Sequence, residues 1–87
     1  MWLTVLLAVL SFLFNRFLDD WQKKDPETPL VAKRKEWLGG RSGQAFAVAS
    51  TMFDIAVEET AKRPVGSKLD TKWLTKVVKQ RTLAEHH

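Results

Sequence analysis

The chain has 87 residues, a formal net charge of +4, no cysteine or tyrosine, and two histidines at positions 86 and 87. This length accommodates one small domain, or one membrane helix followed by a small helical domain. Without cysteine the chain has no disulfide framework and no thiolate metal site. His86 and His87 are typical of a purification-tag remnant. Without cysteine and internal histidine the chain lacks most common metal ligands and the usual general base, so we expect no enzyme activity, no metal and no cofactor.

The first predicted helix covers residues 1–24, because the first proline is Pro26. From Trp2 to Phe14 it carries no charge, and apolar side chains occur almost all round it. A surface helix of a soluble domain has a polar face, so lipid or protein must cover this one. The residues that we expect to anchor it in a membrane are Trp2, Leu6, Leu10, Leu13, Phe14, Phe17 and Trp21.

Two features favour a transmembrane position for this helix. Trp2 and Trp21 are 19 positions apart, about 28 Å of helix and close to the thickness of a bilayer core. Lysine and arginine occur only from Arg16 onward, which predicts an outside N-terminus and a cytoplasmic C-terminal region. The uninterrupted apolar run is shorter than a typical span. The alternative is a soluble cytoplasmic protein in which other helices, or a second copy, cover the helix.

Small and weakly polar residues follow one face of the same helix. Their spacings of four, three and four positions suit close contact with another helix in lipid. We therefore treat this helix-contact stripe as a candidate self-association surface; the alternative is that these residues are small by coincidence. The stripe consists of Thr4, Ala8, Ser11 and Asn15.

Residues 25–29 contain two prolines and form the predicted linker. Residues 30–38 then form a short amphipathic helix, which either lies on a membrane surface with Trp37 at head-group level or packs on the domain core. The glycines of residues 39–43 end this helix, and Ser42 is the expected N-cap of the next one.

The helix predicted over residues 44–61 is rich in apolar and small residues, which is typical of the centre of a bundle. Asp54, Glu58 and Glu59 form an acidic face, which we expect to oppose the basic last helix. Residues 64–67 form a loop.

The last predicted helix has Asp70 as its N-cap, with Leu69 and Leu74 in the positions of a hydrophobic staple. The domain that we expect over residues 30–82 ends with this helix, and residues 83–87 form a frayed tail. The basic side of the helix is the candidate surface for acidic lipid or an acidic partner. It consists of Lys72, Lys76, Lys79 and Arg81.

The sequence therefore predicts an all-α protein: an N-terminal hydrophobic helix followed by a bundle of about three helices. We expect a non-enzymatic, membrane-anchored protein that acts as an accessory or assembly subunit or self-associates in the membrane. Its expected partners are membrane lipid and either a protein or a second copy. The alternatives are a holin-like pore former and a soluble helical dimer that binds acidic partners or nucleic acid, although no nucleic-acid motif accompanies the basic helix. The layout resembles that of small single-span phage lysis proteins and of small accessory subunits of membrane complexes.

Overall fold

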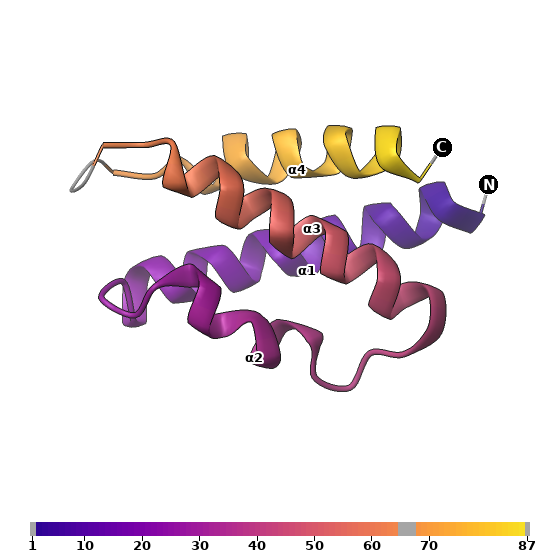
Figure 1. Ribbon diagram of the computed structural model, residues 1–87, viewed down its shortest axis with the longest axis horizontal. Helices are drawn as coiled ribbons and strands as arrows, with labels where there is room; N and C mark the ends of the chain where they lie inside the picture. Colours follow the sequence, from indigo (N-terminus) through magenta and orange to yellow (C-terminus); the bar gives the residue numbers. More distant parts are fainter. Residues whose placement is uncertain (1, 65–67, 87) are drawn as a thin grey trace.

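The computed structural model describes residues 2–64 and 68–86. These residues form α1 (Trp2–Lys24), the 3₁₀ helix η1 (Leu30–Lys33), α2 (Arg34–Leu38), α3 (Gly43–Ala61) and α4 (Thr71–Glu85), as Figure 1 shows. The chain is 80% helical and has no strand in the part that the structure describes. This confirms the predicted fold class, a long apolar N-terminal helix followed by a small helical bundle.

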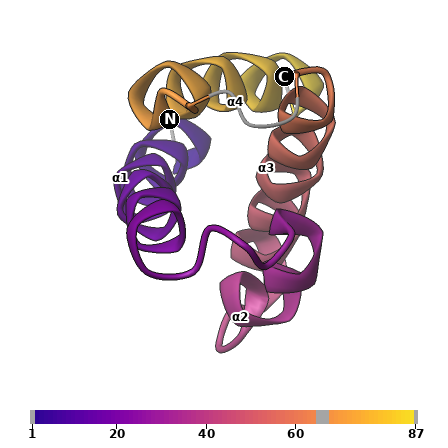
Figure 2. The same cartoon turned by 90° about the vertical axis from the view of Figure 1, so that its left-hand side faces the viewer.

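The helix α4 runs antiparallel to both α1 and α3 (Figure 1). Viewed along the bundle, α1 and α3 lie on opposite sides, α4 lies across them, and α2 lies beside α3 (Figure 2). Hydrogen bonds join α1 to the first half of α4. The side-chain amide of Asn15 donates to the carbonyl oxygen of Thr71 at 3.3 Å and to Thr75 Oγ1 at 3.1 Å, and the Thr71 hydroxyl donates to Asp19.

The helix α1 supplies side chains to the same hydrophobic core as the other helices. Leu7, Leu10, Phe14 and Leu18 are buried on its inner face, spaced as one side of an α-helix requires. The α3 helix contributes the largest share of the core, as its apolar composition predicts, and Leu74 and Val78 close it from α4. The core residues of α3 are Val48, Ala49, Met52, Phe53, Ile55 and Ala56.

The buried side chain of Trp37 fills the space between α1, α2 and α3. Its ring centroid lies 4.8 Å from that of Phe14 and 5.6 Å from that of Phe17. Its indole N–H donates to the carbonyl oxygen of Ala49 at 3.0 Å. Of the two positions that the sequence left open for Trp37, the structure therefore shows the one on the core.

The helix ends follow their expected chemistry, with one exception. Asp70 caps α4 by accepting hydrogen bonds from the backbone N–H groups of Lys72 and Trp73, at 3.1 and 3.2 Å. Leu69 and Leu74 are both buried, as a hydrophobic staple requires. Ser42 is the N-cap of α3 but makes no side-chain capping bond.

The C-terminal end of the chain differs from the prediction. The helix α4 continues to Glu85, beyond residue 82, because the buried side chain of Thr82 holds its last turn against the bundle. Residues 65–67 of the predicted loop and residue 87 of the predicted tail lie outside the described residues.

Candidate membrane-binding surface

The outer face of α1 carries a row of large apolar side chains that the bundle does not cover. The residues of this row are three, four, three and one positions apart in the sequence, so they lie on one side of the helix. We call this row the exposed stripe. It consists of Trp2 (64% exposed), Val5 (54%), Val9 (53%), Phe12 (64%) and Leu13 (40%).

The structure divides the seven predicted anchoring residues between the two faces of α1. Trp2 and Leu13 belong to the exposed stripe, whereas Leu10 and Phe14 are buried in the core. The other three, Leu6, Phe17 and Trp21, are partly buried and pack against the core.

Sequence reasoning missed Val5, Val9 and Phe12 as members of the outer face. Their spacing from Trp2 indicates that they share its face, because residues three, seven and ten positions later lie on the same side of a helix. Since α1 is apolar on both sides, however, the spacing alone did not tell which side faces the bundle.

The structure also divides the helix-contact stripe between the protein interior and the exposed surface. Asn15 bonds to α4, and Ser11 is buried, so these two positions face the protein interior. Thr4 and Ala8 are exposed. The hydroxyl oxygens of Ser11 and Thr82 are buried and have no hydrogen-bond partner among residues 2–64 and 68–86.

Beyond Leu13, the outer face of α1 changes from apolar to charged. Its next exposed residues on this side are Arg16, Asp20 and Lys23. The face is therefore apolar over its first half and charged over its second half. This order is typical of a helix that contacts an apolar medium at one end and water or head groups at the other.

The four predicted basic residues of α4 lie in two different environments. Lys72, Lys76 and Lys79 are exposed. The guanidinium of Arg81 instead donates to Glu58 and Glu59 of α3, at 3.1 Å each. The hydrogen bond to Glu58 raises the pKa of Arg81 further above its ordinary value. This contact matches the acidic face that we expected opposite the last helix, and it leaves the three lysines as the free cations of the predicted set.

Ion pairs elsewhere occupy the acidic residues of α3 and Asp25 of the linker. Asp54 pairs with Arg34, and Asp25 pairs with Lys33. In addition to their contact with Arg81, the carboxylates of Glu58 and Glu59 each lie 3.7 Å from Lys62 Nζ. Within residues 2–64 and 68–86, no lysine of α1 or α4 has an ion pair. Unpaired positive charge therefore gathers on α4, whereas the second half of α1 carries charges of both signs, Arg16, Lys23 and Lys24 against Asp19 and Asp20.

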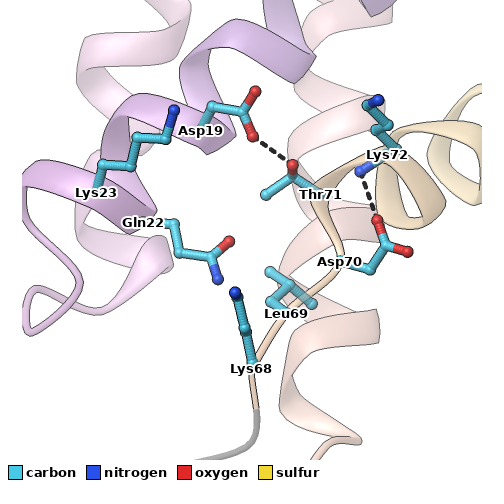
Figure 3. Close-up of a pocket in the computed structure, with 8 residues that line it drawn as sticks. All are labelled: Asp19, Gln22, Lys23, Lys68, Leu69, Asp70, Thr71 and Lys72. Atoms are coloured by element: carbon cyan, nitrogen blue, oxygen red, sulfur yellow. Dashed lines mark hydrogen bonds between the residues drawn. The ribbon is translucent and has the colours of Figure 1, made fainter.

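A groove of about 600 Å³ lies where the end of α1 meets the start of α4 (Figure 3). In Figure 3 the ends of the Gln22 and Lys68 side chains point toward each other across it. Its two carboxylates are already bonded, Asp19 to Thr71 and Asp70 to the backbone at the start of α4. This groove could not be predicted from the sequence, because its two sides are about 50 residues apart in the chain. Its lining consists of Asp19, Gln22, Lys23, Lys68, Leu69, Asp70, Thr71 and Lys72.

Length and composition make α1 a candidate membrane span. Its most apolar window has a mean hydropathy of 1.5, and 28% of that window is buried in the bundle; no other described helix meets the same criteria. A core helix of a soluble protein and a signal sequence meet them too. Among the described residues, no group of three or more His, Cys, Asp or Glu side chains is placed to hold a metal ion.

Comparison with known proteins finds no matching family model and no significant similarity to a curated protein or a solved structure.

Proposed function

We propose that this protein is a non-enzymatic, membrane-attached helical protein that acts as an accessory or assembly subunit or associates with itself at the membrane. The observation that carries the proposal is the exposed stripe of α1, in which five large apolar side chains are 40–64% exposed. The basic side chains of α4 supply the second contact, with acidic lipid or an acidic partner.

The free energy of covering the stripe is large enough to determine where the protein resides. Five side chains about half exposed, two of them aromatic, present on the order of 500 Å² of apolar surface. At 25 cal/mol per Å², removing this surface from water is worth roughly 10 kcal/mol before the costs of association. Isolated exposed apolar residues are common on soluble proteins, whereas a contiguous patch of this size equals the largest patch of an ordinary monomer, and such patches are often functional.

The finer topology that the charge distribution favours is a single span with the N-terminus outside and the C-terminal region in the cytoplasm. In that arrangement α1 must leave α3 and α4, because a helix cannot cross the bilayer while one side contacts a water-soluble bundle. The four core residues of α1 would then face lipid. The transmembrane arrangement therefore requires the bundle to open, whereas the closed bundle supports attachment at the membrane surface.

Cell fractionation without detergent tests the proposal. We expect the full chain to sediment with membranes, and Val9→Glu combined with Phe12→Glu to move it into the supernatant. Val31→Glu is the control, because Val31 is 60% exposed but belongs to η1. A wild-type chain that stays in the supernatant as a dimer, measured by light scattering, would contradict the proposal and favour a soluble helical dimer.

A further inference from the structure

We infer that the closed bundle lies flat on an anionic bilayer, with α1 in the plane of the interface. The exposed stripe enters the boundary between head groups and acyl chains, while the unpaired lysines of α1 and α4 bind head-group phosphates. This inference rests on the proposed attachment through α1, and it names the chemistry of the lipid and the conformation of the attached protein.

The first support is the order of residues along the outer face of α1. The apolar positions end at Leu13, and Arg16, Asp20 and Lys23 follow on the same side, so that two cations and one carboxylate occupy the second half of this face. At 1.5 Å per residue, Lys23 lies about 15 Å beyond Leu13 along the helix axis. A helix lying in the interface therefore immerses its first half and keeps its second half among the head groups, where both cations can reach phosphate.

The second support is the position of the α4 lysines relative to α1. Thr75 accepts a hydrogen bond from Asn15, so this side of α4 faces α1. Lys72 and Lys79 are three positions before and four positions after Thr75, and thus lie along the same edge of α4. A membrane against the outer face of α1 therefore also has these two ammonium groups beside it.

The third support is charge. The groove between α1 and α4 brings Lys23, Lys68 and Lys72 to one end of the bundle, and none of the three has an ion pair in the described chain. Both carboxylates of the groove are occupied by hydrogen bonds within the protein. The groove therefore has three ammonium groups against two carboxylates, and this excess of positive charge, at the end of α1 away from the exposed stripe, complements an anionic head group better than a neutral one.

A second copy of the chain is a poorer occupant of the stripe than lipid. A stable interface buries about 800 Å² on each partner, and the stripe offers on the order of 500 Å². A bilayer can cover the stripe without providing a second protein surface of that area.

The closed conformation keeps contacts that a transmembrane α1 would lose. Asn15 and Asp19 bond to α4, and four apolar side chains of α1 fill the core. Crossing the bilayer would break these bonds and bring Arg16, Asp19 and Asp20 close to hydrocarbon, which is unfavourable for charged groups. Attachment in the interface plane leaves the bundle intact.

Co-sedimentation of the purified full chain with vesicles tests the lipid chemistry. We expect strong binding to phosphatidylcholine mixed with phosphatidylglycerol, weak binding to phosphatidylcholine alone, and release as salt concentration rises. Lys72→Gln combined with Lys79→Gln should weaken binding about tenfold or more, since each lysine at an anionic surface contributes about fivefold. Lys35→Glu changes the net charge equally but lies on α2, and it should bind almost as the wild type does.

A covalent link between α1 and α4 tests the conformation. The chain has no native cysteine, so Asn15→Cys combined with Thr75→Cys can be joined by a short bifunctional thiol reagent. We expect the linked and unlinked proteins to bind anionic vesicles equally well, with circular dichroism confirming that both are folded.

The outcomes separate the two proposals. Equal binding to neutral and anionic vesicles, or binding that the link abolishes, would overturn the flat, closed arrangement and leave membrane attachment in place. Absence of binding to every vesicle, together with a dimer in solution, would overturn both proposals.

Discussion

The indole N–H of Trp37 donates a hydrogen bond of 3.0 Å to the backbone carbonyl oxygen of Ala49, and this contact joins α2 to the middle of α3. Trp37 is 2% exposed, and its ring also contacts Phe14 and Phe17 of α1. One side chain therefore connects three helices, including one, α2, of only five residues. Such a short helix has little stability of its own and depends on this packing.

Trp37→Phe should lower the free energy of unfolding by about 1–2 kcal/mol, because it removes the indole hydrogen bond and part of the ring volume. Trp37→Ala should cost about 3–5 kcal/mol. Urea unfolding followed by circular dichroism measures both values. The control is Trp73→Phe, at a position 42% exposed, which should change stability by less than about 0.5 kcal/mol. Equal losses at the two tryptophans would contradict this account of the core.

Ser11→Ala and Thr82→Val should each raise stability, by up to about 1 kcal/mol, because each replaces a buried hydroxyl that has no hydrogen-bond partner. Asn15→Ala is the matched control on α1, since its amide does bond to α4, and it should lower stability by about 1 kcal/mol. Thermal unfolding of the three variants gives the comparison. A loss of stability in Ser11→Ala would show that its hydroxyl is bonded.

Asp70→Ala should destabilise the protein by about 1 kcal/mol, because α4 loses the side chain that accepts from two of its first backbone N–H groups. Asp70→Asn keeps an accepting oxygen at the N-cap and should retain most of the stability. The difference between the two variants in urea unfolding isolates the cap from the change of charge. No difference between them would assign the effect to charge alone.

The stability of the linker should depend on pH through Asp25. A hydrogen bond from Lys33, with an Nζ–Oδ2 distance of 2.6 Å, and a second from Thr28 lower the pKa of Asp25 below its ordinary value of 3.8. A carboxyl group with a lowered folded pKa stabilises the protein above its unfolded pKa. That stabilisation is lost as the pH falls through the folded pKa.

We therefore expect the Tm of the wild type to fall more than that of Asp25→Asn as the pH drops below 3.8. Thermal unfolding across the acid range measures this difference. Asp20→Asn serves as the control for removing one carboxylate, because Asp20 has no ion pair among the described residues. Parallel acid curves for the wild type and Asp25→Asn would contradict the role of the Lys33 contact.

Local sequence chemistry was enough to predict where the helices lie. Pro26, the glycines of residues 39–43 and the cap at Asp70 predicted the boundaries of α1, α3 and α4 to within about one residue at most ends. The last turn of α4 was missed, because the burial of Thr82 depends on tertiary packing rather than on local sequence.

The candidate site was only partly predictable. Sequence identified Lys72, Lys76 and Lys79 as a basic surface, because exposed lysines on an amphipathic helix are recognised by spacing. It did not identify which apolar residues of α1 stay uncovered, since both sides of that helix are apolar and only the bundle distinguishes Leu10 from Val9. Nor did it identify the groove, which depends on the end of α1 meeting the start of α4.

The contact between α1 and α4 also joins two helices that a ribosome makes at different times, because Asn15 and Thr75 are 60 positions apart. Translation proceeds at about 5–20 residues per second, so α1 emerges several seconds before the partner that bonds to Asn15 and Asp19 is complete. Throughout that interval the inner side of α1 is as uncovered as the outer side. The nascent chain can therefore meet a bilayer or targeting factors before it can fold, and the timing of synthesis helps to decide whether α1 ends in lipid or in the bundle.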